Sequence, residues 1–216
     1  MTRNSQILPI LAIAAASAIA IAGHLMGNLW LIYIFKPLAT ILIFLLAFAN
    51  WTKIKLPFAL WICIGLLFSL LGDILLIWPD QLFVAGLAAF LLAHLAYLTA
   101  STRDAKFPAN WLLWLVFLAI AAANFFALKP TLPAGLALPV AVYAVALSTM
   151  TAQAAGRALL LRTSPAKLAA AGALFFLASD SLLAWNRFHH PIPFAPLPIL
   201  ASYYAAQLLF AVSTTQ

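Results

Sequence analysis

The sequence predicts an all-α polytopic membrane protein with about eight transmembrane helices. Of its 216 residues, 67% are hydrophobic and 7% are charged, whereas an ordinary soluble domain carries about 25% charged residues. A surface with so little charge does not keep a protein of this size dispersed in water. The apolar runs are continuous and approach the roughly 20 residues of a membrane-spanning helix, without the period-two alternation of membrane β-strands. Soluble globular, disordered and β-barrel classes are therefore excluded.

Polar breaks divide the chain into eight expected spans. In order, they cover residues 7–23, 29–49, 57–78, 82–100, 109–128, 132–155, 167–186 and 193–213. The first run is read as a span and not as a signal peptide, because no clear small-x-small cleavage site follows it. Tryptophans near span ends, typical of interfacial anchors, are Trp30, Trp51, Trp78, Trp111 and Trp185. Short connections leave little room for a soluble part, so residues 1–216 are expected to form one integral-membrane domain.

The basic residues predict the orientation in the membrane. Net charge is +7, but the basic residues occur singly in short connections and form no stripe for nucleic acid. One side holds Arg3, Lys53, Lys55, Arg103, Lys106, Arg157, Arg162 and Lys167. The other side holds only Lys129 and Arg187. The positive-inside rule then places both termini in the cytoplasm, and we expect a bacterial inner (cytoplasmic) membrane.

Two segments resemble each other across the chain. Residues 68–78 align with residues 175–185 at an offset of 107, with matching Phe, Leu, Asp, Leu, Leu and Trp. The aligned aspartates are Asp73 and Asp180. Because the offset equals four spans, both segments run in the same direction, as in a parallel four-plus-four duplication.

Three charged residues fall inside predicted spans, where charge normally faces a bundle interior or a wet cavity. At 1.5 Å per helical residue, Asp73, Asp180 and Lys36 lie about 8, 10 and 12 Å below the outer face, in one layer. Asn124 reaches the same layer. A purely structural ion pair of Lys36 with one aspartate leaves the second aspartate unexplained. We therefore favour a polar site in which Lys36 keeps one carboxylate ionised and burial keeps the other protonated.

Other polar residues carry weaker signals. The same counting puts His94 about 20 Å deep, in the inner half, where a packing role is the commoner one. Tyr97 shares its helix face. Ser69 and Ser179 flank the aspartates, with no histidine base expected in their layer.

Cofactor chemistry has no motif in the chain. The adjacent His189 and His190 fit a solvated loop better than a metal site, and neither a zinc-binding helix motif nor a phosphate-binding loop occurs. A nucleophile elbow is also missing. The sequence therefore predicts no metal and no cofactor, and it carries no signal of oligomeric state.

Taken in order, the polar motifs resemble those of the YhhN-like lysoplasmalogenase family over nearly the whole chain. The matching residues are Lys36, Pro37, Leu38, Phe68, Ser69, Gly72, Asp73, Leu76, Phe83, Gly86, Phe90, His94, Tyr97, Gly172, Ser179 and Asp180. The resemblance implies an eight-span membrane hydrolase that cleaves the vinyl ether bond of a lysophospholipid, the lysoplasmalogen. The implied products are a fatty aldehyde and glycerophosphoethanolamine or glycerophosphocholine.

The predicted site suits that chemistry, because vinyl ethers resist bases but yield to acid. Asp73 and Asp180 are the expected catalytic pair, one as general acid and one as a carboxylate that stabilises the cation, with the division between them open. Lys36 either keeps one aspartate ionised or meets the substrate phosphate. Asn28 and Arg187 are expected to assist near the outer mouth.

Two other classes remain open at this stage. A proton-coupled transporter or lipid-moving protein also places Asp and Lys on repeat-related helices. A structural subunit of other membrane proteins predicts no activity in the pure protein. One polar layer near one face looks more like a pocket than a through-path, which favours the enzyme.

Overall fold

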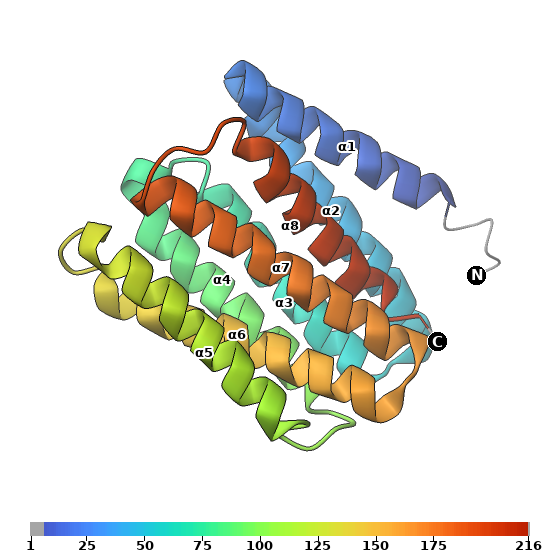
Figure 1. Cartoon of the computed structure of the whole chain (residues 1–216). Coiled ribbons are helices and arrows are strands. Elements are labelled where there is room, and N and C mark those ends of the chain that lie inside the picture. Colours follow the sequence, from blue (N-terminus) through green and yellow to red (C-terminus); the bar gives the residue numbers. More distant parts are fainter. Residues whose placement is uncertain (1–6, 216) are drawn as a thin grey trace.

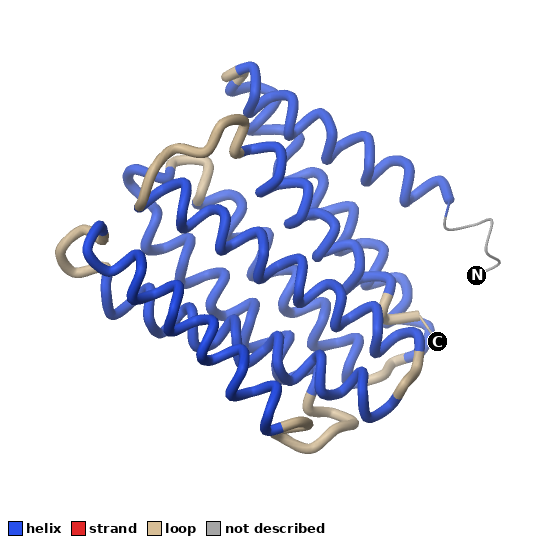
Figure 2. The backbone as a smooth tube through the Cα atoms, viewed as in Figure 1, coloured by secondary structure: helices blue, strands red, loops and turns tan. Residues whose placement is uncertain are grey.

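A computed structural model describes residues 7–215, which form eight α-helices, one short 3₁₀ helix and no strand (Figures 1 and 2). The elements are α1 (Ile7–Met26), α2 (Leu29–Ile54), α3 (Pro57–Leu75), α4 (Pro79–Ser101), α5 (Trp111–Leu128), η2 (Lys129–Thr131), α6 (Ala137–Leu161), α7 (Ser164–Phe188) and α8 (Pro196–Val212). Every expected span is present as a helix. Arg3, used in the charge comparison, lies outside the described residues.

Both boundaries of α6 differ from the prediction, and its end shows the largest error. It begins at Ala137, after a turn in which Gly135 has φ of 86°, so the predicted start at 132 is too early. It also continues to Leu161, beyond the predicted 155. The predicted start of the fourth span, residue 82, coincides with a kink at Leu82 that interrupts the first turn of α4.

The exterior of the bundle suits lipid. Seven of the described helices are long and apolar enough to cross a membrane, and α8 is a shorter apolar helix. Large apolar side chains project outward, among them Leu8, Trp30, Trp111 and Leu138, each at least 66% exposed. The chain is a polytopic membrane protein, as the sequence predicts. Its orientation in the membrane stays a prediction.

Helix packing repeats between the two halves. Within each half the third helix packs on the fourth, as α3 on α4 and α7 on α8, and the first packs on the second, as α1 on α2 and α5 on α6. Between halves, α4 packs on α6 and α8 packs on α2. Figure 1 accordingly places α1 and α5 at opposite edges of the bundle. Equivalent pairs of helices thus pack together within and between the halves, which supports the predicted four-plus-four duplication.

Helix ends agree with the same offset. Helix α2 ends in a left-handed residue, Lys55 with φ of 52°, and α6 ends in one at Arg162, 107 positions later, with φ of 57°. A left-handed residue after the last turn is a common helix terminator. The correspondence between the two halves therefore extends beyond the segments that resemble each other in sequence.

One basic residue of the topology count is not a loop residue. Arg157 lies inside α6 and is 4% exposed. Its Nε and Nη2 each lie 2.6 Å from a carboxylate oxygen of Asp104, in the connection after α4. Its guanidinium also stacks over Phe58 at 4.3 Å. Arg157 is thus a paired, internal charge that joins helix ends, and its inclusion among the free loop charges was wrong.

Candidate active site

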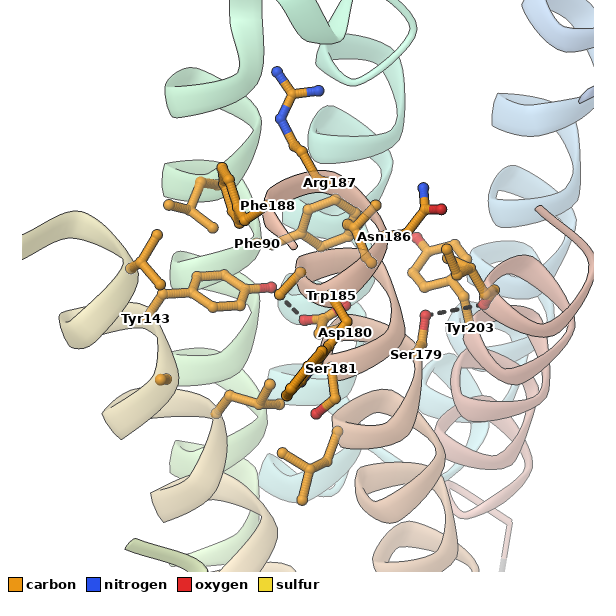
Figure 3. A pocket seen from close by; sticks show the side chains of 18 of the residues that line it. Phe90, Tyr143, Ser179, Asp180, Ser181, Trp185, Asn186, Arg187, Phe188 and Tyr203 are labelled. Atoms are coloured by element: carbon orange, nitrogen blue, oxygen red, sulfur yellow. Dashed lines mark hydrogen bonds between the residues drawn. The ribbon is translucent and has the colours of Figure 1, made fainter. Parts of the chain in front are cut away.

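All eight described helices contribute to one cavity of about 550 Å³. Most of its lining is apolar, and both Asp73 and Asp180 open into it, together with Lys36. Figure 3 shows the part formed by α4, α6, α7 and α8, with Asp180 facing Tyr143. The predicted meeting of the three charged residues around one space is therefore present in the structure.

Asp73 lies in α3 and is 2% exposed. Its Oδ2 accepts hydrogen bonds from Thr40 Oγ1 and from Tyr203 Oη, both at 2.6 Å. Lys36 Nζ lies 3.9 Å from Oδ1. Lys36 and Thr40 are four residues apart on α2, so they share a helix face and approach the same carboxylate. The predicted pairing of Lys36 with one aspartate is thus observed, with Asp73.

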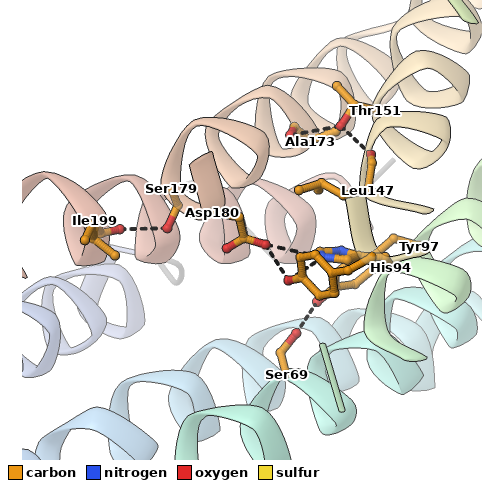
Figure 4. A network of polar contacts seen from close by, with 10 residues as sticks. Ser69, His94, Tyr97, Leu147, Thr151, Ala173, Ser179, Asp180 and Ile199 are labelled. Atoms are coloured by element: carbon orange, nitrogen blue, oxygen red, sulfur yellow. Dashed lines mark hydrogen bonds and ion pairs between the residues drawn. The ribbon is translucent and has the colours of Figure 1, made fainter. Parts of the chain in front are cut away.

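Asp180 lies in α7 and its side chain is 13% exposed. Its Oδ2 accepts a hydrogen bond from Tyr143 Oη at 2.5 Å. His94 Nε2 lies 2.9 Å from the same Tyr143 oxygen and 3.4 Å from Asp180 Oδ2. Asp180, the hydroxyl of Tyr143 and the imidazole of His94 therefore form one compact polar cluster (Figures 3 and 4).

The predicted depth of His94, well below the aspartates, was wrong. Phe83 near the start of α4 contacts Phe188 at the end of α7, so the two helices run in opposite directions. Counted from that contact, Asp180 and His94 differ in depth by only about 4–5 Å. Side chains lean toward the N-terminus of their helix, so on antiparallel helices these two lean toward each other.

The two aspartates are held by equivalent elements. Asp73 of α3 is contacted from α2 of its own half and from α8 of the other half. Asp180 of α7 is contacted from α6 of its own half and from α4 of the other half. The position that holds Lys36 in the first half holds Tyr143, 107 residues later, in the second. Each half therefore completes the aspartate site of the other.

Asn124 and Arg187 also line the cavity. Asn124 Oδ1 accepts a hydrogen bond from Trp185 Nε1 at 3.0 Å, which joins α5 to α7. Trp185 therefore forms part of the cavity wall and is not only an interfacial anchor. Arg187 Nη2 donates to the carbonyl of Pro79 at 3.1 Å, and its guanidinium stacks over Phe83 at 4.3 Å.

Four predicted site residues have other contacts. Asn28 caps α2 by accepting from the amide of Leu31, outside the cavity lining. Ser69 bonds Tyr97, whose hydroxyl donates to Gln207 at 2.7 Å; these residues form a buried network behind the cavity. Ser179 lines the cavity, but its hydroxyl donates to the carbonyl of Ile199 (Figure 4). Neither serine hydrogen bonds a histidine within the described chain, so no activated serine is formed there.

The titratable side chains beyond these clusters do not form a metal site. Across residues 7–215, no group of three or more His, Cys, Asp and Glu side chains is placed to hold a metal ion. His189 and His190 lie at the end of α7, with ring centroids 4.7 Å apart. The residues around the cavity can supply two carboxyl groups, a cation and several hydroxyl donors within an apolar space.

Comparison with known proteins identifies the family. The sequence pattern of the YhhN family matches residues 31–214. The chain belongs to the YhhN family. It is 35% identical to lysoplasmalogenase TMEM86A of Homo sapiens over 187 residues, which are 83% of this chain and 75% of that protein. No solved structure matches the chain.

Two further relatives of this YhhN protein carry the same activity in their names. Lysoplasmalogenase TMEM86B of Sus scrofa is 40% identical over 152 residues, covering 70% of this chain and 62% of its own length. A lysoplasmalogenase of Mycobacterium tuberculosis is 38% identical over 156 residues, covering 69% and 58%. The match spans less than two thirds of both relatives. The family resemblance seen in the motifs is confirmed.

Sequence reasoning missed three hydroxyl groups in the site of this YhhN protein, those of Thr40, Tyr143 and Tyr203. The repeat held a signal for one of them, because extending the offset of 107 from Lys36 leads to Tyr143. Thr40 follows Lys36 by one helical turn, which is a second available signal. Tyr203 had none, since α8 has no motif in the quoted repeat.

Proposed function

We propose that this protein is a lysoplasmalogenase. In this proposal it hydrolyses the vinyl ether bond of lysoplasmalogens to a fatty aldehyde and glycerophosphoethanolamine or glycerophosphocholine, with Asp73 and Asp180 as the acid–base pair. The observation that carries the proposal is the pair of buried carboxyl groups, from repeat-related positions, that open into one largely apolar cavity. The names of the YhhN relatives support the same activity.

The reaction needs an acid and a stabilised cation. A proton moves from a carboxyl group to the β-carbon of the vinyl ether, and the alkene electron pair forms the new carbon–hydrogen bond. Water adds to the resulting oxocarbenium ion, and the hemiacetal then divides into the aldehyde and the glycerol hydroxyl. A similar cation is handled by a carboxylic acid and a carboxylate in glycoside hydrolysis. Two carboxyl groups in unequal surroundings suit these two tasks.

The cavity fits a lipid with a single chain. Its volume of about 550 Å³ lies within the range of roughly 300–1,000 Å³ for small-molecule sites. Apolar residues of α5, α6 and α7, including Ile120, Phe125, Leu147 and Leu177, form one part of the wall and suit the hydrocarbon tail. Arg187 lies near the helix ends, where a phosphate headgroup meets the interface.

The deciding experiment is hydrolysis of a lysoplasmalogen by the purified protein in detergent, with aldehyde release as the readout. Two matched lysolipids, a saturated alkyl ether and an acyl ester, serve as controls. Both are expected to inhibit competitively, since tail and headgroup are unchanged. Neither should be turned over, because the ether has no carbon that accepts the proton and the ester requires a nucleophile with an oxyanion site.

Isotope labelling tests the chemical route. In D₂O the aldehyde should carry deuterium on its α-carbon, measured under conditions that exclude back-exchange. Efficient hydrolysis of the ester, or an unlabelled aldehyde, contradicts acid attack on the double bond. Absence of any lysoplasmalogen turnover by the pure, folded protein contradicts the proposed activity itself and favours a transporter or a structural subunit.

A further inference from the structure

We propose that the structure divides the labour between the two aspartates, with Asp180 as the protonated general acid and Asp73 as the charged carboxylate that stabilises the cation. Tyr143 and His94 act as positioning residues that direct the acidic proton to Oδ1 of Asp180. This assignment rests on the proposed lysoplasmalogenase function and deepens it, because neither the sequence nor the comparisons distinguish the two carboxyl groups.

The proposal assigns one proton to each contact of the Asp180 cluster. The single hydroxyl proton of Tyr143 is donated to Asp180 Oδ2. Toward His94 the Tyr143 oxygen can then only accept, so the proton of the imidazole lies on Nε2. Oδ2 is thus occupied by a donor, and Oδ1 has no hydrogen-bond partner within residues 7–215. A proton carried by Asp180 therefore sits on Oδ1.

The proposal assigns the neutral form to His94. Its ring is fully buried, and its Nδ1 has no hydrogen-bond partner in the described chain. A cationic imidazole would leave a buried N–H unpaired at Nδ1, whereas the neutral form leaves only a lone pair there. Burial of an unpaired charged donor is strongly unfavourable. In the proposal Asp180 therefore has no cation beside it, and the phenol of Tyr143 donates to the carbonyl oxygen of its protonated carboxyl group.

Asp73 has the opposite surroundings. Lys36 Nζ lies 3.9 Å from its Oδ1, and the hydroxyls of Thr40 and Tyr203 both donate to its Oδ2. The nearby cation and the two hydroxyl donors favour the charged carboxylate, and they act against the burial of Asp73, which favours the protonated form. The contrast arises at one repeat-related position, where Lys36 stands in the first half and Tyr143 in the second. Duplication supplied two similar aspartates, and this difference separates their charges.

The reaction then balances within the cavity. The Oδ1 proton of Asp180 moves to the β-carbon of the vinyl ether, which leaves Asp180 as a carboxylate. Asp73 remains charged beside the oxocarbenium ion. As water adds to the cation, it transfers a proton to Asp180 and restores the acid. Division of the hemiacetal moves its hydroxyl proton to the departing glycerol oxygen, so no other reactant is consumed.

Binding of a cationic lipid tests this assignment without turnover. The probe is a lysolipid that carries a protonated secondary amine in place of the ether oxygen, and the saturated alkyl ether is its neutral match. The ratio of their affinities reports the charge in the site. Wild type should prefer the amine. Asp73→Asn should reduce that preference at least about tenfold, the scale of a hydrogen bond to a charged group.

Asp180→Asn is the matched variant, since it alters the repeat-related carboxyl group in the same way. If Asp180 is already neutral, this variant should keep the amine preference within about twofold. Should Asp73→Asn fail to fold, the double variant K36M/D73N, which removes the ion pair as a unit, takes its place. Loss of the preference in Asp180→Asn, or its retention in the Asp73 variant, overturns the assignment. Wild-type turnover is measured separately, so failure of the proposed activity is recognised independently.

Tyr143→Phe tests the positioning role. It removes the donor to Oδ2 but keeps the ring, so kcat should fall at least about tenfold, within the range of acid–base effects. KM and the amine preference should stay within about twofold. A merely structural role would instead change KM and both lipid affinities. Unchanged kcat in Tyr143→Phe contradicts the positioning of Asp180 by this residue.

Discussion

Replacement of Lys36 by methionine separates the structural and electrostatic roles of the ion pair with Asp73. Lys36 is 5% exposed and Asp73 is 2% exposed, so the change leaves a buried carboxylate without its cation. Breaking a buried pair from one side costs about 3–5 kcal/mol. Thr40 and Tyr203 still donate to Asp73, so we expect the low end, about 3 kcal/mol.

The matched control is the double variant K36M/D73N, in which neither charge remains. Because two neutral side chains leave no uncompensated charge, most of the lost stability should return, while turnover should stay low. In thermal unfolding, about 1 kcal/mol corresponds to roughly 2–4 °C for a chain of 150–250 residues. The single variant should therefore unfold about 6–12 °C below wild type in the same detergent.

Two results would refute this reasoning. If Lys36→Met unfolds at the wild-type temperature, the buried charge on Asp73 does not depend on Lys36. If the double variant is no more stable than the single one, the loss comes from packing of the lysine stem in α2. Lipid or detergent bound in the cavity also affects the unfolding temperature. The thermal unfolding measurement is therefore repeated with a saturating concentration of the alkyl ether lysolipid.

Further predictions concern the catalytic pair, orientation and packing. Asp73→Asn and Asp180→Asn should each leave a folded protein and reduce turnover at least about 100-fold. If either variant keeps wild-type turnover, that aspartate has no chemical role in the reaction. A cysteine that replaces Pro191 should be labelled by an impermeant reagent outside intact cells, whereas one that replaces Ser164 should not. The native cysteine, Cys63, is buried. The opposite labelling pattern would invert the predicted topology. Gly72→Ala places a Cβ 2.6 Å from the ring of Phe90 in α4, so the free energy of unfolding should fall by about 1–3 kcal/mol. An unchanged unfolding temperature would show that the ring moves aside without cost.

The helices were accessible to sequence reasoning because lipid imposes a simple rule. Backbone groups in hydrocarbon must bond within their own segment, so each long apolar run becomes a helix. Boundaries were less accessible. Helix α6 starts later than its apolar run, since Gly135 forms a left-handed turn after Pro133. Composition alone does not report such a turn.

The contacts within the site were only partly accessible. Lys36, Asp73 and Asp180 stand out because charge is rare inside spans. Tyr203 does not stand out, and the sequence singles out His94 without its partners, because these contacts depend on which helices meet across the two halves. A depth counted along a single helix misplaced His94, since it ignores the axial offset between α4 and α7 and the lean of side chains on antiparallel helices.

The crossed construction of the two aspartate clusters explains why both halves are needed for one site. Without α8, Asp73 loses the hydroxyl of Tyr203; without α4, the Asp180 cluster loses His94. Each half already supplies one donor to its own carboxyl group, Thr40 or Tyr143, and the other half adds a contact from Tyr203 or His94. Tyr203 and His94 therefore join the two halves at the cavity, whereas Lys36 and Tyr143 act within their own halves. In the proposed division of labour, the difference between Lys36 and Tyr143 at one repeat-related position makes one carboxyl group the acid and the other the carboxylate around one cavity.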